Sequence, residues 1–255
     1  QRTTLMFHSR SLSIICLRLA LTAVLLGTGL AAHAQIGEPR NNFAVGANVG
    51  LTMNTVGFDP TIKQSMLMSP TFGVTARITS EKYFTMVCAL QVELNYATLG
   101  WKEDIIDANT NPLPDQYERQ LHYLQLPLLA RLGWGREKKG VMGYIVAGPQ
   151  VGFMLSETTK QSEFTLTDEG VPNRPNGMVA QYSMPIDRKF DYGITGGAGI
   201  ELSTKAGHFL LEGRYYYGLG DIYNNSKKDV FSRSNHGTII VKFTYLFDIN
   251  KNKNK

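Results

Sequence analysis

The feature that most constrains this chain is a repeated alternation of apolar residues with small or polar residues. Between residues 43 and 54, odd-numbered positions are apolar and even-numbered positions carry Ala, Gly, Asn or Thr. A period of two places alternate side chains on opposite faces of a β-strand, so such a stretch predicts a strand with one apolar face. After Gln35 the sequence shows no sustained 3.6-residue period and no run of 18 apolar residues, which excludes a helical membrane protein.

Eight stretches show this alternation, one of them weakly. Residues 141–155 are largely apolar on both faces, so the sequence does not orient that stretch. Several of the stretches have about the 9–11 residues that a tilted strand needs to cross a bilayer. The expected strands are 43–54, 71–78, 84–96, 123–132, 141–155, 190–202, 208–219 and 237–247.

The connections between the expected strands alternate in length. The long ones are 54–70, 99–120, 156–189 and 220–236, and the short ones are 79–83, 135–140 and 203–207. Outer-membrane barrels have short periplasmic turns and longer extracellular loops, whereas a soluble β-sandwich has no reason to segregate its loops. The sequence therefore predicts an all-β fold, an eight-stranded antiparallel up-and-down transmembrane β-barrel.

Residues 1–34 are predicted to be an export signal. Basic residues precede the apolar run 19–30, and the small-x-small site Ala32-His33-Ala34 follows it. A membrane anchor helix is the weaker alternative, because the apolar run is short. We expect cleavage between Ala34 and Gln35, both termini of the mature chain in the periplasm, and the long loops outside the cell. The expected domains are a signal peptide at 1–34 and a barrel domain at 35–255, with strands within about 43–247 and a basic tail at 248–255.

The net charge of +5 does not belong to the body of the chain. Of the 26 basic residues, three lie in 1–34 and three in 248–255, whereas 20 of the 21 acidic residues lie between those segments. The body is thus neutral, and nucleic acid is not an expected partner.

The faces opposite the apolar ones should point into the barrel. Eight strands enclose only enough room for side chains, so an open pore is not expected. Charges in so narrow a lumen are tolerated only when they are paired, which predicts a hydrogen-bonded network that plugs it. A proton or ion relay is the functional alternative to this structural interpretation. The predicted network contains Arg77, Glu93, Arg131, Asp191, Glu201, Glu212, Arg214 and Lys242.

Aromatic residues near the ends of the expected strands favour the same orientation. Amphipathic rings prefer the headgroup region of a bilayer. Tyr83 and Trp134 fall at the expected periplasmic ends, and Tyr96, Trp101 and Tyr217 fall near the extracellular ends.

A lipid-modifying barrel enzyme is a second hypothesis. His122 and Ser156 lie at the expected extracellular ends of the fourth and fifth strands, with Asp104, Asp107 and Asp115 in the connection before His122. Such a set could serve nucleophilic hydrolysis, but a histidine at the rim is the simpler interpretation. We therefore expect no enzyme, and no catalytic, cofactor-binding or metal site. The third hypothesis is an interaction protein that binds through its loops, of which 156–189 is the longest.

Several stretches resemble the PorT-like outer-membrane β-barrel family, also called porin-family proteins. They follow the family's order and cover nearly the whole mature chain. The resemblance implies an eight-stranded barrel in the outer membrane, but no single function, since the founding member serves protein secretion and gliding. The matching stretches are Phe43–Leu51, Leu90–Tyr96, Tyr123–Leu129, Ala147–Gly152, Phe190–Gly199 and Leu211–Gly220.

We therefore expect a small outer-membrane barrel with a plugged lumen, which acts as a structural or interaction component through its extracellular loops. The alternatives are an accessory component of a PorT-type secretion system and the lipid-modifying enzyme. The expected partners are the bilayer of the outer membrane, the barrel-assembly machinery during biogenesis, and a surface or secretion-complex protein. No cofactor is expected.

Overall fold

The computed structural model describes residues 38–106, 111–137, 139–164, 166, 178–226 and 228–250. The predicted signal peptide, with its cleavage site between Ala34 and Gln35, lies outside the described residues. So do residues 251–255 of the predicted basic tail.

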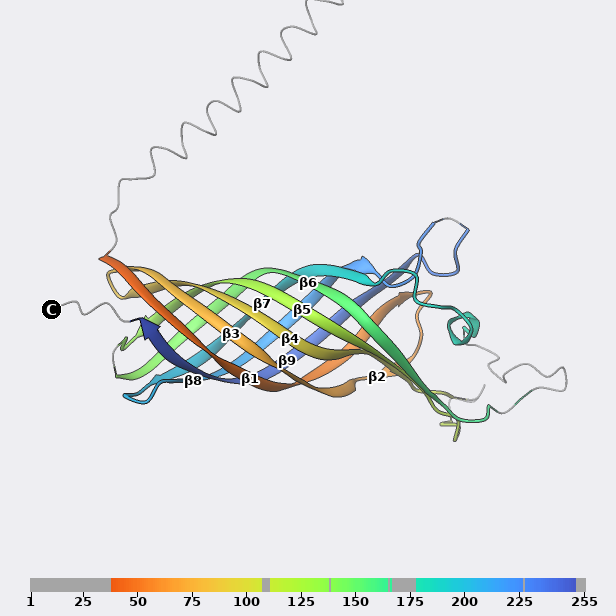
Figure 1. Cartoon of the computed structure of the whole chain (residues 1–255). Coiled ribbons are helices and arrows are strands. Elements are labelled where there is room, and N and C mark those ends of the chain that lie inside the picture. Colours follow the sequence, from red (N-terminus) through yellow and green to blue (C-terminus); the bar gives the residue numbers. More distant parts are fainter. Residues whose placement is uncertain are drawn as a thin grey trace, which may run out of the picture. The chain divides into compact units, whose positions relative to one another are not determined.

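Long antiparallel strands make up most of the described chain (Figure 1). Each pairs with the next along the chain, and β1 lies between β3 and β9, so that the sheet closes on itself. The prediction of an eight-stranded antiparallel up-and-down barrel is confirmed. A two-residue strand, β2 (Gln64–Ser65), is added at the end of β4, and one turn of 3-10 helix, η2 (Ala180–Tyr182), precedes β7. The long strands are β1 (Glu38–Asp59), β3 (Leu67–Tyr83), β4 (Met86–Glu103), β5 (Tyr117–Gly135), β6 (Gly140–Gln161), β7 (Phe190–Ser203), β8 (His208–Asp221) and β9 (Arg233–Asn250).

The predicted faces are found in the barrel. On β1, Val49 and Leu51 are exposed on the outer wall, whereas Asn48 and Thr52 are buried inside. The stretch that the sequence left unoriented, in β6, has its odd positions outside and its even positions inside. Its inner face carries Tyr144 and other apolar groups, which explains why both faces looked alike in the sequence.

The strands extend beyond the predicted limits at both ends of the barrel. β1 begins at Glu38 and β9 ends at Asn250, so part of the predicted tail is strand. The connection between β3 and β4 is only Phe84 and Thr85, because β3 continues to Tyr83. The start of β1, the end of β9 and the short turns share one end of the barrel, which we call the turn end; the other is the loop end (Figure 1). At the loop end the four long connections are shorter than predicted. Strands such as β6 continue past the part of the wall that has an apolar outer face, which we call the belt.

The inner and outer faces exchange character near the loop end. On β4, Leu94 faces outward, but Leu99 and Trp101 are buried inside, and exposed Lys102 lies on the outer wall. β1 shows the same change, with Leu51 outside and Phe58 inside. We call the part of the wall beyond this change of faces, at the loop end, the protruding part. Its outer surface meets water rather than lipid, so apolar side chains gain by turning inward. The prediction that Trp101 belongs to an outer aromatic girdle is therefore wrong, since its side chain is fully buried.

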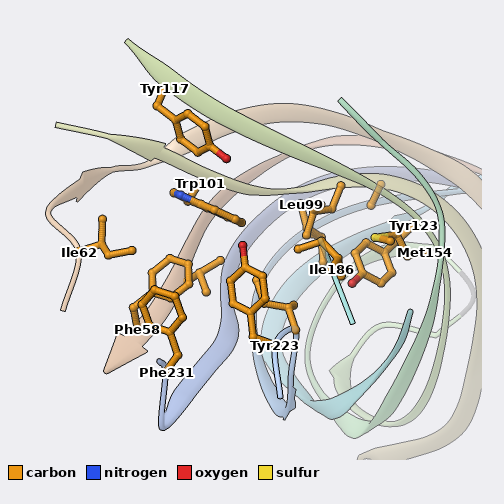
Figure 2. Close-up of a cluster of buried hydrophobic side chains, with 14 of the residues drawn as sticks. Phe58, Ile62, Leu99, Trp101, Tyr117, Tyr123, Met154, Ile186, Tyr223 and Phe231 are labelled. Carbon is orange, nitrogen blue, oxygen red and sulfur yellow. The ribbon is translucent and has the colours of Figure 1, made fainter. Parts of the chain in front are cut away.

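The inward apolar side chains of the protruding part form one cluster, which we call the aromatic cluster (Figure 2). Phe58 packs against Trp101 and Phe231, with ring centroids 5.1 Å apart in both pairs. Tyr223 stacks on Phe231 at 5.5 Å. These rings are buried in the interior at the loop end, where the sequence alone predicted only connections. Across the described ranges, no helix is long and apolar enough to cross a membrane.

Candidate functional site

The barrel interior is the candidate functional site, and its first group of charges surrounds Glu201 near the turn end. Glu201 accepts a hydrogen bond from Arg77 at 2.7 Å and forms a second ion pair with Arg131. His208 lies 2.6 Å from the same carboxylate through Nδ1, and its Nε2 is 2.9 Å from Asp248. One buried carboxylate thus joins β3, β5 and β8 to β7.

The second group lies deeper in the belt and centres on Glu93 and Arg214. The Arg214 guanidinium donates to both Glu93 oxygens, at 2.8 and 3.0 Å, and also contacts Glu212. Lys242 contacts Glu93 as well. All four side chains are almost completely buried, and their charges balance. This is the arrangement in which buried ions are tolerable.

Neutral side chains complete this second group. Gln91 donates to Glu93 at 2.8 Å and to Glu212 at 3.1 Å, and the Tyr144 hydroxyl donates to Glu212 at 2.7 Å. Arg131 of the first group lies over the Tyr144 ring, 3.6 Å from its centroid. Tyr144 therefore links the two groups. The sequence missed it, because it lies on the stretch that could not be oriented.

Inward glycines of β7 make room for these long side chains. A Cβ at Gly199 would lie 2.6 Å from the Tyr144 ring, so this ring can lie against the inner wall only because β7 carries no side chain there. A Cβ at Gly197 would lie 2.2 Å from the Gly213 carbonyl and 2.9 Å from the Arg214 side chain, so this glycine admits the β8 backbone as well as Arg214.

Asp191 stands apart from the other seven residues of the predicted network. It is buried nearer the loop end, and the Tyr216 hydroxyl donates to it at 2.7 Å. His236 is fully buried in the same part of the interior, edge-on to the Tyr123 ring at 5.6 Å. The structure thus joins seven of the predicted residues in two groups and leaves Asp191 in a separate polar contact.

A segment that we call the lid (Met178–Ile186) lies over the loop end of the interior. Arg119 of β5 donates to two of its backbone carbonyls, to Met184 at 2.7 Å and to Gln181 at 3.3 Å. Glu103 of β4 accepts from the Gln181 amide at 3.1 Å and from the Tyr182 hydroxyl at 2.7 Å. Arg119 as a donor and Glu103 as an acceptor thus each hold the lid against the barrel wall by hydrogen bonds.

The lid also packs on the aromatic cluster. The Tyr182 ring lies 4.7 Å from the Tyr117 ring, and Ile186 is buried in the cluster (Figure 2). The Tyr223 hydroxyl is 3.1 Å from Arg119. Burial raises the pKa of Tyr223, so its hydroxyl stays neutral and can accept this hydrogen bond.

The residues of the enzyme hypothesis do not assemble around His122. Its ring lies on the outer wall, stacked on Tyr96 at 6.0 Å. Its nitrogens lie 3.1 and 3.4 Å from the hydroxyls of Thr98 and Thr158. Ser156 is opposite His122 in the β-ladder without being one of these contacts. Of the three aspartates, Asp107 lies outside the described residues, Asp104 is exposed and Asp115 is buried.

A serine, a histidine and an aspartate do meet at the turn end, which the sequence did not suggest. Ser203 Oγ is 3.0 Å from His208 Nδ1, on the ring edge opposite Asp248. However, Glu201 lies 3.1 Å from the same hydroxyl and 2.6 Å from the same nitrogen. The carboxylate accepts both protons, so the imidazole offers Ser203 no free lone pair as a base. We interpret this group as a structural hydrogen-bonded contact that joins β7, β8 and β9. In the described part of the chain, no cluster of three or more His, Cys, Asp or Glu side chains could hold a metal ion.

Among solved structures, the chain is similar to the outer membrane protein OprG from Pseudomonas aeruginosa, with 13% identity, a TM-score of 0.43, and coverage of 83% of this chain and 98% of OprG. It is also similar to Ail, the attachment invasion locus protein of Yersinia pestis, with 10% identity, a TM-score of 0.34, and coverage of 82% and 99%. No curated protein matches the chain. A family model described as "Outer membrane protein beta-barrel domain" matches residues 33–224. Because that match covers most of the sequence, the chain belongs to the outer-membrane protein β-barrel domain family, and it is a protein of the outer membrane.

Proposed function

We propose that this protein is a barrel with a closed lumen that acts as a structural or interaction component of the outer membrane. Its contacts with other molecules would be made by the protruding loop end. The observation that carries the proposal is the set of large and charged side chains buried in the interior. Two groups of paired charges occupy the belt, and the aromatic cluster with its lid occupies the loop end.

The charge pairing supports a closed lumen rather than a relay. Arg77, Arg131, Arg214 and Lys242 each contact a carboxylate, and each is buried. Moving one of these side chains aside would leave its partner as an unpaired charge at low dielectric, which costs several kcal/mol per ion. The network therefore opposes the opening of a pore.

The proposal includes a topology. The segment 1–34 would direct export, the turn end and both termini would face the periplasm, and the loop end would face the outside. The alternation of tight turns with longer connections supports this orientation, as in other outer-membrane barrels. The partners would be the barrel-assembly machinery during biogenesis and then a surface protein.

The proposal assigns no enzymatic activity, and the contacts of His122 support this. Its neighbours are threonine hydroxyls and an aromatic ring, which suit a histidine in the headgroup region. His122→Ala should leave the lipid profile of the outer membrane unchanged, and an altered profile would support the hypothesis of a lipid-modifying enzyme. The role of a PorT-type secretion accessory rests on the sequence resemblance alone and stays the second candidate.

Site-directed photo-crosslinking in intact cells tests the interaction role. A crosslinking residue at Lys102 or Lys228, both exposed at the loop end, should give a reproducible adduct with one surface protein. The matched position is Lys205, which is exposed in a turn at the opposite end. Adducts with a partner protein from Lys205 alone, or none from the loop end, would contradict the proposal.

A further inference from the structure

The barrel wall is uneven in height at the loop end. β7 begins at Phe190, which pairs with Phe153 of β6, and the Met154 N–H donates to the Lys189 carbonyl at 2.7 Å. β6 nevertheless continues to Gln161, paired with β5 on its other side (Figure 1). Within the described residues, no strand pairs with the β7 side of Leu155–Gln161. We call this segment the β6 edge.

The backbone groups that point away from β5 can be identified. The Ser162 N–H donates to the Gln116 carbonyl at 3.0 Å, so residue 162 directs its backbone toward β5. Backbone direction alternates along an antiparallel strand. Glu157, Thr159 and Gln161 therefore direct their N–H and C=O groups toward the open side.

The β6 edge is accessible and its charges are already balanced. Every residue from Leu155 to Gln161 is exposed, including those on the inner face. Glu157 pairs with Arg119 at 2.8 Å, and Lys160 pairs with Glu118 at 3.4 Å. Natural edge strands are usually protected from pairing by proline, bulges or free charges. The β6 edge has no proline, and its two charges have partners within the hairpin. Its register shift against β5 lies at Leu155, at the start of the edge, and the pairing from Ser156 to Gln161 is regular.

We propose that the β6 edge binds an extended segment of a partner protein as an added antiparallel strand. Main-chain hydrogen bonds to Glu157, Thr159 and Gln161 would supply affinity, as in other cases of strand addition. The segment would be uncharged and rich in β-branched residues, because the edge offers threonines and no unbalanced charge. The inference rests on the proposed role of the loop end as an interaction surface and names its mode of recognition.

A second copy in the same membrane is not the expected occupant. In every copy β6 runs from the turn end to the loop end, so two β6 edges side by side would run in parallel. The antiparallel register that continues the barrel requires a strand that runs toward the membrane. A partner segment that arrives from the outside can satisfy this direction.

Amide hydrogen exchange of the full chain in micelles tests the proposal. The probe is a synthetic peptide of alternating threonine and valine, and its control is the same peptide with every second amide N-methylated. Millimolar probe should slow exchange of the Thr159 and Gln161 amides at least roughly tenfold, a factor worth about 1.4 kcal/mol. The methylated control should not slow it. Edge amides that are already protected without peptide, or that stay unprotected with it, would overturn the proposal.

Two variants of Thr159 separate strand addition from side-chain recognition. Thr159→Pro removes an edge N–H without removing a bond to β5, whereas Thr159→Val keeps the N–H. With circular dichroism confirming the fold of both, only the proline variant should lose the protection. Equal binding by both variants would overturn the proposal. The absence of crosslinked adducts from positions 102 and 228 in the chain with an unsubstituted edge would instead count against the proposed function, since Lys102 and Lys228 lie off this edge.

Discussion

Arg214 of β8 spans the interior to Glu93 of β4, with its two terminal nitrogens 2.8 and 3.0 Å from the two carboxylate oxygens. Bidentate pairs of this kind fix geometry as well as charge. Lys242 binds the same carboxylate, and Glu212 supplies the second negative charge. Glu93 of β4 thus binds two adjacent strands, β8 and β9, through residues that lie 121 and 149 positions later in the sequence.

Glu93→Gln tests the energetic weight of this group. The substitution leaves the Arg214 and Lys242 cations with one carboxylate, Glu212, in a buried site. Breaking a buried pair by removing one partner costs about 3–5 kcal/mol. Denaturant unfolding of the protein in lipid vesicles should show that loss, whereas Glu163→Gln, at an exposed position, should change stability by less than about 0.5 kcal/mol. A loss below about 1 kcal/mol for Glu93→Gln would contradict the buried network.

The two tryptophans test the exchange of faces along the wall. Trp134 is 42% exposed on the outer wall at the turn end, whereas Trp101 is 0% exposed inside the protruding part. In vesicles that contain lipid-borne quenchers, fluorescence of the Trp101→Phe variant, which retains Trp134, should be quenched strongly. Fluorescence of Trp134→Phe, which retains Trp101, should resist quenching. The reverse order would place Trp101 in the outer girdle.

Arg119→Met tests the attachment of the lid. The variant removes the donor to the Met184 and Gln181 carbonyls, and hydrogen bonds to a charged group are worth about 1.5–3 kcal/mol. Amide exchange in the lid should therefore accelerate by roughly tenfold or more, while exchange in the belt strands stays unchanged. Lys102→Met is the control, because its exposed side chain points away from the lid. Unchanged lid exchange in Arg119→Met would show that Glu103 and the aromatic contacts hold the lid without Arg119.

Thiol labelling tests the proposed topology. Lys228→Cys lies in the connection between β8 and β9, and Lys205→Cys lies in the turn between β7 and β8. An impermeant thiol reagent applied to intact cells should label the first and not the second. The unsubstituted chain gives the background from Cys88, which is partly buried. Labelling of Lys205→Cys alone would show that the turn end faces outward, which contradicts the proposed topology.

The sequence predicted which residues face lipid, because the alternation is strict within the belt. Val49 and Asn48 sit on opposite faces of β1 as their chemistry requires. The ends of the strands were missed, because apolar residues change face there. On β4 the outward series ends at Tyr96, and Leu99 with Trp101 begins an inward series of opposite phase. A scan for such a reversal would have extended the strand.

Long-range partners could not be read from the sequence. Tyr144 and Glu212 are 68 residues apart and meet because both lie opposite Gly199 of β7, which carries no side chain between them. Asp191 has the same alternation signal as Glu201, yet it lies too far along β7 to reach an arginine of the network. Charge and phase thus predicted which groups are buried, but the register between strands decided which of them pair.

Conductance of the full chain in a planar bilayer tests the central claim, that paired charges and packed rings close the lumen. We predict no stable conductance steps under conditions in which an open porin used as a control conducts. A large and stable conductance from the correctly folded protein would contradict a closed interior.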